Sequence, residues 1–147
     1  KNEREFDQYL YDNDDFLVVV AAGNKGPELN TVGSPATSKN VISVGASENS
    51  PPHISGNMKG KDHLARFSSR GPTQDDRTKP DIVAPGIFIE SAASRTGTGE
   101  CGIDGLHFLA GTSMAAPVVS GAAAIVRQYF REGYYPSGKK NAADELD

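Results

Sequence analysis

The sequence predicts an α/β fold: a parallel sheet with flanking helices and a buried central helix that begins at Ser113. Two stretches carry this prediction. Residues 16–22 read FLVVVAA, a continuous apolar run rich in β-branched residues that is typical of a strand buried on both faces of a parallel sheet. Residues 113–126 are small or apolar on every side, which is typical of a helix buried all round.

The other expected elements follow in chain order. Residues 2–13 carry Phe6, Tyr9 and Leu10 at helical spacing among charged residues, which predicts an amphipathic helix. Residues 48–61 are rich in Pro, Gly, Asn and Ser and predict a surface loop. Further strands are expected at residues 41–46, 81–84, 88–91 and 106–110. With no internal repeat or linker, 147 residues fit one domain.

Net charge and composition exclude several classes of binding partner. The formal net charge of -4 and the pI near 5.3 argue against nucleic acid or an anionic membrane as the partner. No apolar stretch is long enough to span a bilayer. Cys101 is the one cysteine, so the chain forms no internal disulfide.

Ser113 lies at a special position of its helix. Proline fits only the first turn of a helix, so Pro117 allows the helix to begin no earlier than about Ser113. Backbone N–H groups there lack intrahelical partners and the macrodipole is positive, so an anion next to the Ser113 hydroxyl would be stabilised. The alternative is that Ser113 or Thr112 merely caps the helix.

Five short sequence motifs, the last of which contains Ser113, occur along the chain. They are AAGN at 21–24, VISVGA at 41–46, FSSRGP at 67–72, KPDIVAPG at 79–86 and GTSMAAP at 111–117. In this order they resemble the motifs of subtilisin-like serine proteases, the subtilases, and the resemblance runs from about residue 16 to 131. It implies part of a subtilisin-like parallel sheet, an endopeptidase activity and a polypeptide substrate.

The resemblance also implies roles for single residues. Ser113 would be the nucleophile, and the Asn24 side-chain amide and the Ser113 N–H would stabilise the oxyanion that forms on the attacked carbonyl. The substrate-binding residues would be Ala21, Ala22, Gly23, Gly111 and Thr112. Asn24 as a turn residue and the small residues as close packing are the alternatives. No cofactor is assigned; structural calcium is common in the family, but no ligands for it are identified here.

The base that a serine nucleophile needs is not apparent in the sequence. Subtilases carry an aspartate and then a histidine, in a His-Gly-Thr type of motif, before the serine. His53, His63 and His107 are not followed by Gly-Thr; the first two fall in polar segments and His107 in a predicted strand.

We therefore expect residues 1–147 to be the C-terminal portion of a catalytic domain, with the Asp and His on a preceding portion. The isolated chain should lack protease activity, and it should pair with that missing half, dimerise, swap elements or aggregate. The family resemblance implies a secreted or extracytoplasmic location.

Two other interpretations stay open at this point. One is a catalytically dead subtilase-like module that serves as a binding or scaffold domain. The other is an unrelated α/β ligand-binding domain in which Ser113 caps a helix that binds an anion. The G-x-G-x-x-G string at 97–102 precedes no helical pattern and predicts a loop, and the DNDD cluster at 12–15 lacks the spacing of a calcium loop.

Overall fold

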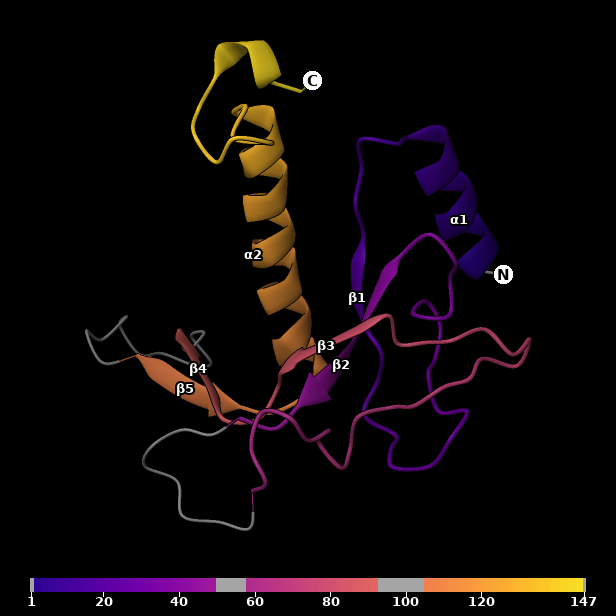
Figure 1. Cartoon of the computed structure of the whole chain (residues 1–147). Coiled ribbons are helices and arrows are strands. Elements are labelled where there is room, and N and C mark those ends of the chain that lie inside the picture. Colours follow the sequence, from indigo (N-terminus) through magenta and orange to yellow (C-terminus); the bar gives the residue numbers. More distant parts are fainter. Residues whose placement is uncertain (1, 50–57, 93–104, 147) are drawn as a thin grey trace.

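A parallel sheet of three strands, in the order β1-β2-β3, organises the fold (Figure 1). The computed structural model describes residues 2–49, 58–92 and 105–146. The elements in chain order are α1 (Asn2–Asp12), β1 (Val19–Ala21), β2 (Ile42–Ser47), β3 (Ile82–Pro85), β4 (Ile89–Ala92), β5 (Leu106–Leu109), α2 (Thr112–Arg131) and the short 3-10 helix η1 (Ala142–Asp144). Each strand and helix expected from the sequence is present, with its ends shifted by a few residues.

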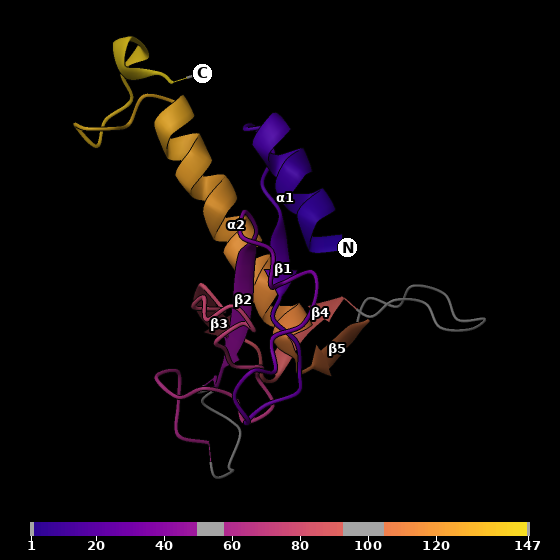
Figure 2. The same ribbon diagram turned by 90° about the vertical axis from the view of Figure 1, so that its right-hand side faces the viewer.

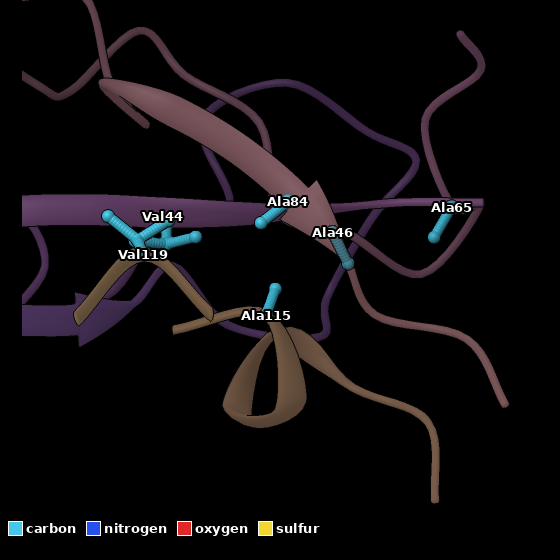
Figure 3. Close-up of a cluster of buried hydrophobic side chains, with 6 residues drawn as sticks. All are labelled: Val44, Ala46, Ala65, Ala84, Ala115 and Val119. Carbon is cyan, nitrogen blue, oxygen red and sulfur yellow. The ribbon is translucent and has the colours of Figure 1, made fainter. Parts of the chain in front are cut away.

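Helix α2 packs across the sheet and forms the core with it. In the parallel register Val20 of β1 lies opposite Ser43 of β2, and Ala46 of β2 lies opposite Ala84 of β3. Val44 and Ala46, which alternate along β2, pack against Ala115 and Val119 of α2. Figure 3 shows the resulting cluster of buried side chains: Val44, Ala46, Ala65, Ala84, Ala115 and Val119. Most are alanines, which lets the helix approach the strands closely.

The expectation that α2 is buried on all sides is wrong for this chain. Its buried residues are Thr112, Ala115 and Val119, all in the first half of the helix. Ile125 is 68% exposed and Val126 is 56% exposed, and the later turns extend past the strands in both views (Figures 1 and 2). The three strands cover only one side of the helix. The second apolar face of α2, which carries Val118, Ile125 and Val126, is therefore exposed to solvent.

Strand β1 is also shorter and less buried than the FLVVVAA run predicts. Only residues 19–21 pair with β2, and all three are half-buried. Phe16 and Leu17 are about half exposed. The reason is that β1 is at an edge of the sheet, so among the described residues one side of it has no neighbouring strand.

The remaining two strands do not join the parallel sheet. β4 and β5 pair with each other in an antiparallel ribbon, with Ile89 opposite Leu109 and Ala92 opposite Leu106. All four residues of β5 are exposed. This ribbon leaves the sheet after β3 and returns the chain to the start of α2.

A buried lysine joins β3 to the beginning of β2. Lys79 is 6% exposed, and its ammonium donates to the Val41 carbonyl at 2.9 Å and to Asp81 Oδ2 at 2.7 Å. The same Asp81 oxygen accepts the Ser43 N–H at 2.7 Å. Because the buried charge is both paired and hydrogen-bonded, its desolvation is offset where these strands meet.

The turn before β3 supplies a pH-dependent contact. Hydrogen bonds from Arg77 Nε (2.7 Å) and Thr73 Oγ1 (2.6 Å) hold the pKa of Asp75 at about 2, below its ordinary 3.8. Since the folded-state pKa is lowered, the stabilisation is present above the unfolded pKa and is lost as the pH falls toward 2.

An NMR titration of the Asp75 carboxyl carbon should therefore give a midpoint near 2. Arg77→Gln should raise that midpoint, because it removes the stronger of the two donors. An Asp75 midpoint near 4 in the unaltered protein would contradict this account of the turn.

Two observations concern the described residues alone. None of their helices is long and apolar enough to cross a membrane. Within residues 2–49, 58–92 and 105–146, no group of three or more His, Cys, Asp or Glu side chains is arranged to hold a metal ion.

Candidate functional site

The site lies at the carboxyl end of the parallel strands, the edge at which α/β sheets bind ligands. Asn24 follows β1 after two residues, and Gly86 directly follows β3. Gly86 accepts the Gly111 N–H at 2.8 Å, so the residue before α2 is fixed to the end of β3. A Cβ on Gly86 would come within 2.6 Å of the Ala46 Cβ, so only glycine allows this approach.

Asn24 and the first residue of α2 are joined directly, although 88 positions separate them. Asn24 Oδ1 accepts the Thr112 N–H at 3.0 Å and the Thr112 hydroxyl at 3.0 Å. The Thr112 oxygen in turn accepts the Gly23 N–H at 3.2 Å. Since a backbone N–H can bond only to an acceptor, the oxygen of the Asn24 amide faces Thr112, and its NH₂ group remains available as a donor.

Gly111 keeps the space beside this NH₂ group open. A Cβ at Gly111 would come within 3.3 Å of Asn24 Nδ2 and 3.6 Å of Met114 Sδ. The absence of a side chain at position 111 therefore leaves room for another molecule next to the amide.

Ser113 is exposed in the first turn of α2. The Met114 N–H donates to the Gly111 carbonyl at 3.0 Å, and Thr112 uses its N–H for Asn24. Within the part of the chain that the structure describes, neither the Ser113 N–H nor its hydroxyl has a hydrogen-bond partner. The two groups thus stand free at the positive end of the helix dipole.

The residues expected to form a pocket wall lie next to Asn24. Ala21 is half-buried at the end of β1, whereas Ala22 is 1% exposed and bonds through its N–H to Val44. Gly23 has a φ of +110°, a conformation that favours glycine. These positions are adjacent to the site, and their contact with substrate stays a prediction.

The described histidines do not reach the serine. His63 and His107 are exposed, and neither is hydrogen-bonded to Ser113. His107 lies on β5, as the alternating pattern predicts. His53, Cys101 and the G-x-G-x-x-G string at 97–102 lie outside the described residues.

Sequence reasoning missed how the site is held together. Thr112 was expected to bind substrate or to cap the helix. The N-cap is Gly111, with no side-chain cap bond, and the Thr112 hydroxyl instead links Asn24 to Gly23. Ser69 was read only as part of a framework block, yet it bonds to the residues on either side of Asn24. Two adjacent small polar residues within a block of this kind, here Ser68 and Ser69, are the signal that could have indicated buried hydrogen bonds.

Comparison with known proteins agrees with the motifs. A family model described as the Subtilase family (Peptidase_S8) matches residues 2–141, which extends beyond the 16–131 match of the motifs at both ends. The serine protease AprX of Bacillus subtilis is 41% identical over 118 residues, covering 76% of this chain and 26% of that protein.

Solved structures show the same relationship. Sphericase has a TM-score of 0.59 at 32% identity, and the match covers 83% of this chain and 36% of that one. The patellamide maturation protease PatA has a TM-score of 0.61 at 32% identity, covering 89% of this chain and 39% of that one. The chain thus spans about a quarter to two fifths of the length of these relatives.

Proposed function

Because this chain belongs to the subtilase family, we propose that it supplies the nucleophile and the oxyanion-stabilising groups of a serine endopeptidase. Ser113 is the nucleophile, and the Asn24 amide and the Ser113 N–H are the two donors. The observation that carries the proposal is the hydrogen bonding of Asn24 to Thr112, which brings a free amide and an exposed serine to one helix end.

The chemistry follows from these groups. The Ser113 oxygen bonds to the carbonyl carbon of a peptide while its proton passes to a base, and the carbonyl electrons move onto the oxygen. The two donors stabilise that charge as it develops. The C–N bond then breaks, the amine leaves with the proton, and water releases the acyl group from the serine.

Neither histidine in the part of the chain that the structure describes is hydrogen-bonded to Ser113. We propose that the base is a histidine, oriented by an aspartate, on a portion that precedes this chain. The order of the family motifs supports this, as does the 36–39% coverage of the solved relatives. The isolated 147 residues should then have no protease activity.

The exposed apolar surfaces fit the same proposal. The free side of β1 and the second face of α2 would be covered by the preceding portion. A groove of about 620 Å³ is lined by the segment that leads into β1, including Leu17, and by α2 residues that include Ala124 and Arg127. We extend the proposal to a secreted or extracytoplasmic location, which is common among subtilases.

A fluorophosphonate probe tests the assignment in the complete protein. Such probes react with an activated serine, so mass spectrometry should place the adduct on the peptide that contains Ser113. Peptide hydrolysis should be inhibited in proportion to labelling. A protein that hydrolyses no peptide and takes no probe would instead be the catalytically dead binding or scaffold module.

The isolated chain should not remain monomeric in solution. Val118 (44% exposed), Ile125 (68%) and Val126 (56%) leave an apolar face on α2, and β1 leaves a free strand edge. Light scattering of the purified 147 residues should show dimers or larger species.

The paired change Ile125→Lys and Val126→Glu should reduce this association, because it makes the exposed helix face polar. A monomer with cooperative unfolding, seen without any substitution, would contradict the prediction.

Oxidation of Met114 should impair activity in the complete protein. Its sulfur lies 3.6 Å from the place that a Gly111 side chain would occupy, next to the Asn24 amide. The sulfoxide is larger and more polar, so it would crowd the space for the oxyanion. Peroxide treatment should lower kcat as mass spectrometry detects oxygen on Met114.

A Met114→Leu variant should keep its activity under the same peroxide treatment, although Met58 can still be oxidised. Full Met114 oxidation with unchanged turnover would show that this sulfur does not border the reacting group.

A further inference from the structure

Ser69 attaches the loop that carries Asn24 through two hydrogen bonds. The Ser69 N–H donates to the Gly23 carbonyl at 2.9 Å, and the Ser69 hydroxyl accepts the Lys25 N–H at 3.1 Å. These two bonds meet the backbone just before and just after Asn24. A third bond, from the Gly26 N–H to the Phe67 carbonyl at 2.8 Å, continues the attachment.

The fit between Ser69 and the loop is close. Ser69 is 1% exposed, so its hydroxyl is shielded from water that could replace the bond. A Cβ on Gly23 would come within 2.9 Å of Ser69 Oγ. The loop can therefore approach Ser69 only because residue 23 has no side chain.

Asn24 needs such support because its own side chain is exposed and gains little from packing. Its amide oxygen is fixed by Thr112, and its backbone is fixed by the bonds on either side. A donor that stabilises a transition state must be held within about 0.5 Å of its productive position. Loss of either attachment would let the NH₂ group move away from the oxyanion.

We propose that Ser69 is a positioning residue for the reaction, acting through Asn24 and not through contact with the substrate. This inference rests on the proposed function, since it assumes that Asn24 stabilises the oxyanion. It assigns to Ser69 an effect on kcat that a purely structural serine would not have.

The neighbouring Ser68 provides a matched control. It is also 1% exposed, and its hydroxyl also accepts a backbone N–H, that of Ala46 at 3.0 Å. Ala46 lies in β2, so this bond is not one of those that attach residues 23–26. Ser68→Ala and Ser69→Ala therefore remove the same kind of buried bond from two different places.

The experiment uses the complete protein with both single variants. Ser69→Ala should lower kcat by about tenfold with KM changed less than twofold, because one positioning hydrogen bond is lost. Ser68→Ala should keep kcat within about twofold of the unaltered protein, with a similar loss in Tm. Equal kcat values in the two variants would overturn the proposal.

A double variant tests whether Ser69 acts through Asn24. In an Asn24→Ala background, adding Ser69→Ala should lower kcat by less than about twofold, because the donor that Ser69 positions is already absent. A further tenfold loss would overturn the proposal. Should Ser69→Ala not fold, Ser69→Cys and Ser68→Cys replace the pair, since a thiol fills the space but accepts hydrogen bonds weakly. Ser69→Cys alone should then lower kcat.

These outcomes separate the two proposals. If the unaltered protein shows no Ser113-dependent hydrolysis, the proposed function is wrong. If it is active but Ser69→Ala behaves like Ser68→Ala, only the role of Ser69 is wrong.

Discussion

Ser113→Ala should abolish peptide hydrolysis by the complete protein and remove labelling by a fluorophosphonate probe. The alanine keeps the small volume at the start of α2 but has no oxygen to form the acyl-enzyme. Because Ser113 is exposed and its hydroxyl makes no hydrogen bond within the described residues, the variant should fold with an unchanged Tm. Hydrolysis rates, probe labelling and thermal unfolding measure the three effects.

The nearby Ser120 is a suitable control. It lies on the same helix, is exposed, and donates its hydroxyl to the Ala116 carbonyl at 3.1 Å. Ser120→Ala should leave labelling intact. Continued labelling of the Ser113→Ala protein would remove Ser113 from the role of nucleophile.

Asn24→Ala should lower kcat far more than it changes KM, because an oxyanion donor acts mainly in the transition state. Removing a side-chain amide donor from the oxyanion hole of a subtilisin costs about 10²–10³ in kcat, and we carry that magnitude over to this relative. Steady-state kinetics with a peptide substrate give both constants.

Asn24→Asp makes the test more specific. The carboxylate keeps the size of the side chain and can still accept the Thr112 N–H, but it offers no donor. Its kcat should be at least as low as that of the alanine variant. A raised KM with unchanged kcat in both variants would indicate ground-state binding instead.

Much of the fold could be predicted because its signals are local. The apolar runs and the turn-rich segments between them predicted the strands β1 to β5 and the helices α1 and α2 in order, but not the 3-10 helix η1. The limit set by Pro117 was less accurate, because α2 begins at Thr112 and Pro117 lies inside the helix, beyond its first turn. The position of Asn24 at the end of a strand and that of Ser113 in the first helical turn also followed from local sequence. The sequence resemblance added that the two belong to one site.

The sequence could not predict which apolar face of a helix or strand is covered by another element of this chain. Val119 and Ile125 look alike in a pattern, but three strands bury the first and leave the second 68% exposed. The prediction that residues 16–18 are buried was wrong for the same reason, because they lead into β1, the edge strand. The antiparallel pairing of β4 with β5 and the bonds from Ser69 to the Asn24 loop depend on contacts between distant segments, which no local pattern specifies.

The buried Lys79 has a consequence for how the protein responds to its medium. A bound metal ion that bridges a carbonyl and a carboxylate stabilises a fold only at sufficient free concentration, so dilution or a chelator removes it. Lys79 places an ammonium group between the Val41 carbonyl and Asp81, and this cation is covalently attached to the chain. The junction between the start of β2 and β3 therefore keeps its positive charge in a chelating medium and at any protein concentration.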